Sequence, residues 1–219
     1  MANLSLHFLL IFLSFHSIIA TITESVTTQN QDNAKFMKLS DSVTAQNPDA
    51  TNFIKISCKK CLYPTICVQS LSTYANTIQL NKQQLAHAAL SVSLSKARIA
   101  STYISMVTRM KGLKPRELQA AKDCSNTMND SVYQLSRSIP ELGQSGKLTS
   151  RRDEFTWHVS NVQTWISAAL TDENTCLDMF NNPSMDGKIK DSVRARVFAA
   201  AQVTSNALAL VYQFAEKQL

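Results

Sequence analysis

The chain contains few of the residues that interrupt helices or that most often carry out chemistry. Its 219 residues include four glycines, five prolines and four histidines. There is no glycine-rich phosphate loop, and the Asp186-Gly187 pair lies between helical patterns rather than between alternating strands. These absences argue against phosphate-loop enzymes and against a sheet built from β-hairpins.

Candidate catalytic and metal-binding groups are equally scarce. Beyond residue 20 the histidines are His87, which we expect to pack partly buried beside an apolar stripe, and His158, which we expect at the surface. No paired carboxylates stand out, and no His/Cys spacing matches a zinc site. The sequence therefore predicts a protein that is not an enzyme and needs no cofactor or metal.

The one long apolar run is at the N-terminus, where residues 1–20 read MANLSLHFLLIFLSFHSIIA. The run is too short for a comfortable membrane span and is followed by small residues, although no Lys or Arg precedes it. We interpret residues 1–20 as a secretory signal peptide; a buried N-terminal helix is the alternative. The protein is expected to be soluble and secreted, without a membrane anchor.

Cysteine is present in an odd number. In the oxidising environment outside a cell, Cys58, Cys61, Cys67, Cys124 and Cys176 are expected to form disulfides with one residue left over. Cys58 and Cys61 form a C-x-x-C pair, which is also found in redox and metal sites. Without a second pair or a preceding strand, that motif alone is weak evidence.

The net charge is +6 and the isoelectric point is near 9.1. A basic exported protein can associate with an anionic polysaccharide or with an acidic partner surface, and the alternative is a merely solvated basic surface. Nucleic acid is not expected as a partner, because the basic residues are scattered and do not alternate with aromatic ones.

Composition divides the rest of the chain into a polar tail and a helical domain. Residues 21–52 are rich in Thr, Asn, Gln, Ser and Asp, and SVTTQNQDNAKF at 25–36 returns as SVTAQNPDATNF at 42–53. We expect this segment to be disordered. Residues 53–219 form the predicted domain, in which a short unit at 54–76, bent at Tyr63-Pro64, should make a helical hairpin.

Clusters of glycine and proline divide the region after Asn81 into four long segments. The clusters are Gly112 with Pro115, Pro140 with Gly143 and Gly146, and Pro183 with Gly187. Each segment has an apolar stripe at helical spacing, which predicts an all-α, antiparallel up-down-up-down four-helix bundle. The stripes are Leu85, Ala89, Val92, Ile99, Tyr103, Met106 and Met110, interrupted by Lys96; Leu118, Ala121, Met128, Val132, Leu135, Ile139 and Leu142; Phe155, Val159, Val162, Ile166, Ala169 and Leu170; and Val193, Val197, Ala200, Thr204, Ala207, Val211 and Phe214.

Four motifs along the chain have a recognisable pattern. Cys58 and Cys67 flank Tyr63-Pro64, and Asp123-Cys124 is followed by SVYQLSRS at 131–138. VQTWISAALTDENTCLDMF at 162–180 and VTSNALALV at 203–211 complete the set. Together they resemble plant pectin methylesterase and invertase inhibitors, whose first cysteine pair follows the pattern C-x-x-T-x-Y-P-x-x-C. The resemblance covers the chain from about residue 54 to the end, and it implies a four-helix bundle with an N-terminal hairpin.

The resemblance also implies which cysteines pair. It assigns disulfides to Cys58–Cys67 and Cys124–Cys176 and leaves Cys61, where the family pattern has Thr, as the free thiol. Lys59 and Lys60 would favour the thiolate of Cys61 and make it reactive. The alternative is that the change from Thr to Cys at this position is unimportant.

Carried over motif by motif, the family's partner-binding positions fall on two segments of the predicted bundle. They are Asn126, Asp130 and Tyr133 after Cys124, and Gln163, Thr175 and Asp178 around Cys176. The esterase inhibitors tend to have acidic residues where Asn126 and Tyr133 stand. Asn129-Asp130-Ser131 is in addition a glycosylation sequon beside these positions.

The resemblance implies a secreted inhibitor of plant pectin methylesterase, located in the cell wall or apoplast. Inhibition of acid invertase is the alternative, but the Pro-Lys-Phe segment of invertase inhibitors is absent from FNNPSMDGKIKD at 180–191. A third reading is a non-inhibitory wall-associated binding bundle, held on anionic pectin by its net charge. The pro-region of a pectin methylesterase is disfavoured, since no catalytic domain follows Leu219.

Overall fold

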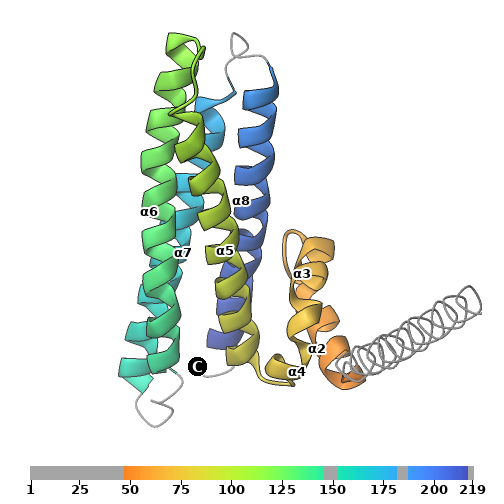
Figure 1. Cartoon of the computed structure of the whole chain (residues 1–219). Helices are drawn as coiled ribbons and strands as arrows, with labels where there is room; N and C mark the ends of the chain where they lie inside the picture. Colours follow the sequence, from red (N-terminus) through yellow and green to blue (C-terminus); the bar gives the residue numbers. More distant parts are fainter. Residues whose placement is uncertain (1–46, 146–151, 182–186, 217–219) are drawn as a thin grey trace, which may run out of the picture. The chain divides into compact units, whose positions relative to one another are not determined.

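The computed structural model describes residues 47–145, 152–181 and 187–216 (Figure 1). These residues form an all-α fold, as predicted, with no β-strand among them. The elements are α2 (Pro48–Cys58), α3 (Pro64–Leu71), the 3₁₀ turn η1 (Ser72–Tyr74), α4 (Ala75–Ile78), α5 (Lys82–Val107), α6 (Pro115–Ser145), α7 (Arg152–Met179) and α8 (Lys188–Ala215).

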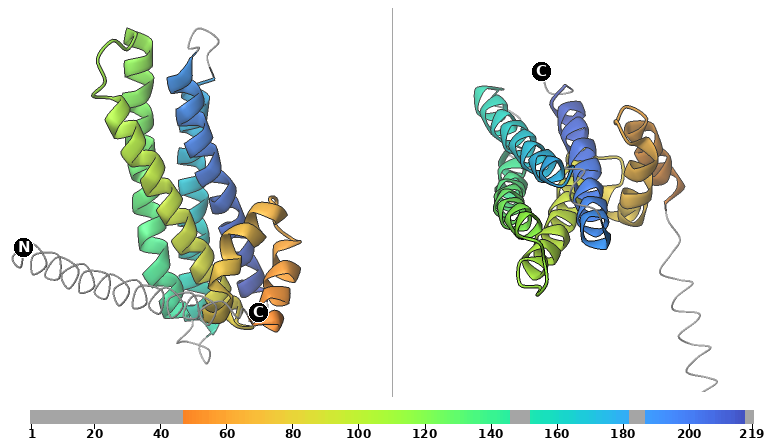
Figure 2. Two further views of the ribbon diagram at one scale, coloured as in Figure 1. Left: turned by 45° about the vertical axis from the view of Figure 1, so that its right-hand side comes forward. Right: turned by 90° about the horizontal axis from the view of Figure 1, so that it is seen from above.

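The four long helices α5 to α8 form the predicted antiparallel bundle. Each packs against the next in the chain, and α8 closes the ring by packing against α5. Figure 2 shows this arrangement along and across the bundle axis. The stripe predicted for α8 is buried at all seven positions, and the α7 stripe is buried from Phe155 to Ala169.

The stripe predicted for α5 is wrong in its C-terminal half. Ile99, Met106 and Met110 are exposed by 55%, 55% and 51%. The fully buried row is shifted by one residue and keeps the alternating four- and three-residue steps of a bundle seam. It consists of Ala86, Leu90, Ser93, Ala97, Ala100, Ile104 and Val107, each 0% exposed.

The second predicted helix break, at Pro140, Gly143 and Gly146, is present but begins later than Pro140, because α6 ends at Ser145 and α7 begins at Arg152. α6 continues through Pro140 and Gly143 to Ser145. Proline removes the hydrogen bond to the carbonyl four residues earlier. Because Pro140 lies on the solvent side of the helix, water can satisfy that carbonyl. The breaks at Gly112 and Gly187 are confirmed: both residues have positive φ, 83° and 133°, outside the helices.

The hairpin before the bundle consists of α2 and α3, bent between Cys58 and Pro64. Pro64 occupies the first turn of α3, where its missing N–H leaves no helical hydrogen bond unmade. The disulfide Cys58–Cys67 joins the two arms, with a Cα–Cα distance of 5.6 Å. α2 begins at Pro48, inside the predicted tail, because Asn47 caps it by accepting hydrogen bonds from the backbone of Asp49 and Ala50.

Buried polar side chains of α8 attach the hairpin to the bundle. The Asn206 Oδ1 accepts a hydrogen bond from the Tyr63 backbone N–H at 3.0 Å, and its Nδ2 donates to the Tyr63 carbonyl at 2.9 Å. The Gln213 Nε2 donates to the Ser57 carbonyl at 3.2 Å. Asn206 is 3% exposed, so these bonds form away from water and fix the hairpin against α8.

The predicted signal peptide at 1–20 and most of the polar tail lie outside the described residues. In the described part of the chain, no helix combines the length and the apolarity needed to cross a membrane.

Candidate partner-binding face on α6 and α7

Four contacts set the antiparallel register of α6 and α7. From one end to the other they are the disulfide Cys124–Cys176, the Ser131–Glu173 hydrogen bond, the Arg137–Trp165 stack and the Glu141–His158 pair. The disulfide joins residues 52 apart in the sequence. A cross-link of that span contributes about 4 kcal/mol in the chain-entropy account.

Five of the six residues predicted to bind a partner lie on the outer side of this helix pair. Asn126, Asp130 and Tyr133 are exposed on α6, at the four- and three-residue steps that place side chains on one face. Thr175 and Asp178 are exposed on α7, on either side of the buried Cys176. The disulfide therefore holds the two groups at the same end of the bundle.

Gln163 does not belong with the other five. Its neighbours Asn161 and Trp165 both contact side chains of α6. Gln163 is two positions from each, or about 200° around the helix, so it faces away from α6.

Hydrogen bonds at the C-terminal end of α7 limit the freedom of two predicted residues, Thr175 and Asp178. The Thr175 hydroxyl donates to the Thr171 carbonyl at 2.8 Å, so its oxygen remains available only as an acceptor. The Asp178 Oδ1 accepts from Asn181 Nδ2 at 3.0 Å, and Arg194 in turn donates to the Asn181 side chain and to the Leu177 carbonyl.

Sequence reasoning missed a stacked cluster in the middle of the face. The Arg137 guanidinium lies 3.5 Å from the ring centroid of Trp165 and 5.6 Å from that of Tyr133. Tyr133 is 60% exposed, so its ring is held in place while open to a partner. The spacing of Tyr133 and Arg137, four residues apart on one helix face, is the signal that would have found this pair.

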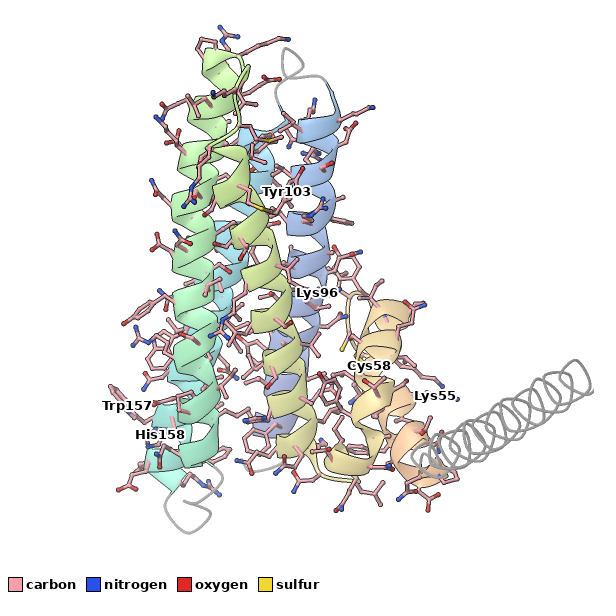
Figure 3. All side chains as sticks on the ribbon, viewed as in Figure 1. Lys55, Cys58, Lys96, Tyr103, Trp157 and His158 are labelled. Atoms are coloured by element: carbon pink, nitrogen blue, oxygen red, sulfur yellow. A yellow bond between two sulfur atoms is a disulfide. The ribbon has the colours of Figure 1, made fainter. Side chains whose placement is uncertain are left out.

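Below that cluster, a second network involves Glu141. Its Oε1 accepts from Asn161 Nδ2 at 2.8 Å and from His158 Nδ1 at 2.9 Å. Partial burial would raise the pKa of Glu141, but the hydrogen bonds from Asn161 and His158 and the nearby positive charges outweigh it and lower the pKa. Figure 3 shows His158 near one end of the bundle, beside the exposed Trp157. His158 is half-buried rather than at the surface, and His87 is exposed rather than partly buried, so both expectations were wrong.

The face is acidic. α6 and α7 together carry nine Asp or Glu and four Lys or Arg residues. Partial burial, with a further contribution from the charge of Asp130, raises the pKa of Asp172 across the helix pair. Two neighbouring carboxylates of this kind favour a basic group on whatever binds there.

One acidic residue of α7 points into the bundle instead. Glu173 is 0% exposed, and its Oε1 accepts hydrogen bonds from Ser131 Oγ at 3.0 Å and Thr204 Oγ1 at 3.1 Å. Its Oε2 has no partner among the described residues. Burial raises the pKa of Glu173 to about 8, although the two hydrogen bonds act in the opposite direction.

Cys61 is the free cysteine, but it is not the activated thiol that the neighbouring lysines suggested. Its side chain is 7% exposed, with Sγ 3.8 Å from Cys67 Sγ. Burial raises the pKa of the Cys61 thiol to about 11. Lys59 and Lys60 are exposed and do not offset the burial, so the thiol is protonated at neutral pH.

The sequon residue Asn129 lies at the edge of the face. Its Oδ1 accepts a hydrogen bond from Ser101 Oγ of α5 at 2.7 Å, which directs the side chain away from α7. A glycan on Asn129 stays a prediction. It would extend over α5 rather than across the gap between α6 and α7.

In the residues the structure describes, no three His, Cys, Asp or Glu side chains gather in a group that could hold a metal ion. What the face offers is an acidic, partly aromatic surface of preorganised side chains. Such a surface suits protein recognition better than covalent chemistry.

Comparison with known proteins assigns this arrangement to one family. A sequence model described as plant invertase/pectin methylesterase inhibitor matches residues 52–210. The chain is 51% identical over 161 residues to the "21 kDa protein" of Daucus carota, a match that covers 74% of this chain and 82% of that protein. It is 48% identical over 161 residues to pectinesterase inhibitor 11 of Arabidopsis thaliana, covering 74% and 79%.

Solved structures show the same fold. A crystal structure of a pectin methylesterase inhibitor from Arabidopsis thaliana matches with a TM-score of 0.52 at 19% identity, covering 74% of this chain and 95% of that one. A mutant form of a pectin methylesterase inhibitor from Arabidopsis matches with a TM-score of 0.57 at 21% identity, covering 71% and 92%.

Proposed function

Since the chain belongs to the plant invertase/pectin methylesterase inhibitor family, we propose that it inhibits a plant pectin methylesterase by covering the substrate cleft in a stoichiometric complex. The protein is an inhibitor and not an enzyme, in keeping with relatives named pectinesterase inhibitors. Neither cofactor nor turnover takes part in the proposed mechanism.

The observation that carries this proposal is the exposed group of Asn126, Asp130, Tyr133, Thr175 and Asp178 around the Cys124–Cys176 disulfide. These side chains come from two rigid helices, so little conformational entropy is lost when they bind. Asp130 and Asp178 would accept charge-assisted hydrogen bonds from basic groups of the esterase. The Tyr133 ring, supported by Arg137, would supply an aromatic contact of the kind that dominates interface energies.

Acid invertase is the second candidate target, because the family name covers both enzymes. The absence of a Pro-Lys-Phe segment at 180–191 favours the esterase. Residues 182–186 of that loop lie outside the described part of the chain, so the preference rests on the sequence alone. A third candidate is a wall-associated bundle that binds without inhibiting. We place the protein outside the cell, in the wall, on the strength of the predicted signal peptide.

A parallel titration tests the choice of target. The chain lacking residues 1–20, produced through a secretory route, would be titrated near pH 6 against a plant pectin methylesterase and an acid invertase. Loss of esterase activity that ends at one inhibitor per enzyme supports the proposal. Inhibition of invertase alone transfers the function to the second target, and folded protein that inhibits neither favours the non-inhibitory bundle.

Substitutions on the face test where the enzyme binds. Asp178→Ala and Asp130→Asn should each weaken the complex by about 1–3 kcal/mol, a loss of about 5- to 150-fold in affinity. The expected cause is the loss of a charge-assisted hydrogen bond across the interface. Inhibition constants measured for each variant give the result.

Asp191→Asn on α8 is the matched control, since it removes the same charge from an exposed position on a helix that contributes no residue to the proposed face. If Asp191→Asn weakens inhibition as much as Asp130→Asn, the effect is one of overall charge and the proposed face is wrong. Asn129→Gln should leave inhibition unchanged if a glycan there extends over α5.

A further inference from the structure

On the opposite pair of bundle helices, a groove runs between the hairpin and the seam of α5 and α8. Its volume is about 460 Å³, which is in the range of small-molecule sites, roughly 300–1,000 Å³. α3 and η1 form one wall with Gln69, Thr73 and Tyr74, and the bundle forms the other with Ser95 and Lys96 of α5 and Gln202 of α8. Figure 3 shows Lys96 on α5, at the height of the upper end of the hairpin.

Most polar side chains of this groove have no partner within the described protein; the exception is Ser70, whose hydroxyl donates to the Cys67 carbonyl at 3.1 Å. Gln69, Thr73, Ser95, Lys96 and Gln202 make no side-chain hydrogen bond or ion pair with any residue that the structure describes. Two amides, two hydroxyls and an ammonium therefore face one groove without internal partners. The Tyr74 ring, 39% exposed, lies among them.

The groove lies in the most one-sided part of the charge distribution. Residues 51–116 contain ten Lys or Arg and no Asp or Glu, so α3, η1 and α5 carry no carboxylate at all. α8 carries Asp191, which is five positions before Arg196 and therefore on a different side of the helix. Nothing within the groove neutralises Lys96.

A second cation extends the groove along the seam. Arg196 precedes the groove residue Ala199 by three positions, or about 4.5 Å along α8. Its guanidinium lies 3.9 Å from the ring centroid of Tyr103, seven positions after Lys96 on α5, and its Nη1 donates to the Ser192 carbonyl at 2.9 Å. Lys96 in the groove and Arg196 beyond its end thus carry two positive charges along the same seam.

We propose that this groove binds an acidic oligosaccharide, a short chain of uronic acid units. Lys96 and Arg196 pair with successive carboxylates. The free amides and hydroxyls donate to and accept from the sugar hydroxyls, which need both kinds of partner. The Tyr74 ring packs against the apolar face of one sugar. Ile66, Val92 and Val203 also line the groove, so an acidic peptide is the competing occupant that the experiment below distinguishes from a saccharide.

This site is separate from the proposed inhibitory face, which lies on α6 and α7. The protein could therefore hold an acidic polysaccharide on one side while an enzyme occupies the other. Loss of oligosaccharide binding should leave enzyme inhibition intact, so the two proposals succeed or fail independently.

The probe is trigalacturonic acid, titrated calorimetrically into the chain lacking residues 1–20 at low salt. Lys96→Gln should weaken binding about tenfold, and Tyr74→Ala should weaken it severalfold. Lys114→Gln is the matched control: it removes the same charge from the same acid-free segment, outside the groove. It should change the affinity less than twofold. The melting temperature of each variant checks that it folds.

Neutral maltotriose and a poly-aspartate peptide complete the experiment. Weak or absent binding of maltotriose supports the role of the carboxylates. No binding of trigalacturonic acid, or an equal loss in Lys96→Gln and Lys114→Gln, overturns the site. Poly-aspartate binding that is as tight and as sensitive to Lys96→Gln overturns the assignment to a saccharide.

Discussion

At the scale of single residues, Glu173 is an ionisable side chain buried in the interior of the bundle, where burial disfavours its charged form. It is the only Asp or Glu that the structure buries completely among the described residues, and one of its oxygens has no partner there. The sequence did contain the signal, because Ile166, Ala169, Glu173 and Cys176 follow the spacing of the buried stripe. Periodicity does not predict that the hydroxyls of Ser131 and Thr204 donate hydrogen bonds to the Glu173 carboxyl.

Glu173 should make stability depend on pH. Its pKa is raised from 4.5 to about 8 in the folded state, so between these values the folded protein binds more protons than the unfolded chain. Stability from this group is fully present below about pH 4.5 and is lost as pH rises toward 8. We expect the melting temperature to fall by several degrees between pH 5 and 8. For a chain of this size, each kcal/mol of unfolding free energy that is lost lowers the melting temperature by about 2–4 °C.

Glu173→Gln should flatten that pH dependence, since an amide cannot ionise. Asp153→Asn, an exposed position of the same helix, serves as the control and should keep the wild-type profile. Thermal unfolding of the three proteins across this pH range gives the comparison. A Glu173→Gln variant with the same slope as wild type would show that the carboxyl is not the cause.

At the scale of elements, α5 shows that a large apolar side chain is not always a buried one. Its largest apolar residues form a row that includes Ile99 and Met106, while the seam consists mostly of Ala and Ser one position later. Small residues allow close approach of neighbouring helices, and each of them buries little area on its own. In the N-terminal half the row of large residues is buried as well, because the hairpin covers that part of α5.

The shifted register can be measured with two isoleucines of one helix. Ile104→Ala should cost about 2–5 kcal/mol of unfolding free energy, because it removes methyl groups from a fully buried site and leaves a cavity. Ile99→Ala removes the same atoms from a side chain that is 55% exposed and should cost under about 1 kcal/mol. Urea unfolding of both variants tests this. Equal losses of unfolding free energy would mean that the row predicted from the sequence, which includes Ile99, is buried after all.

Helix existence and order could be predicted from the sequence, but helix faces and ends only in part. The α7 and α8 stripes are made of large apolar residues, so periodicity alone finds them. Pro140 and Gly143 are breakers by local preference, yet α6 continues because its packing against α5 and α7 outweighs the cost of one missing hydrogen bond. Of the candidate face, motif carry-over found five exposed residues. The stack of Arg137 on Trp165 depends on how two helices lie side by side, which a single sequence does not contain.

At the scale of the whole molecule, the two disulfides restrain very different lengths of chain. Cys58–Cys67 joins residues nine apart, whereas Cys124–Cys176 joins residues 52 apart. In the chain-entropy account, replacing both cysteines of the long link by Ser should cost about 4 kcal/mol, against about 2.6 kcal/mol for the short one. Guanidinium unfolding of each double variant measures the difference. A greater loss of unfolding free energy in the Cys58 and Cys67 double variant would contradict this expectation. It would mean that the hairpin disulfide stabilises the protein more than its loop length predicts.

Acidic residues gather on α6 and α7, while α5, α8 and the hairpin carry a surplus of basic ones. The bundle therefore has a permanent electric dipole directed across its axis. The helix macrodipoles contribute little to it, since antiparallel neighbours largely cancel along the axis. Near a negatively charged polymer such a body experiences a torque as well as an attraction. It turns its basic side toward the polymer before any specific contact forms, and the side bearing Asp130 and Asp178 is left facing outward.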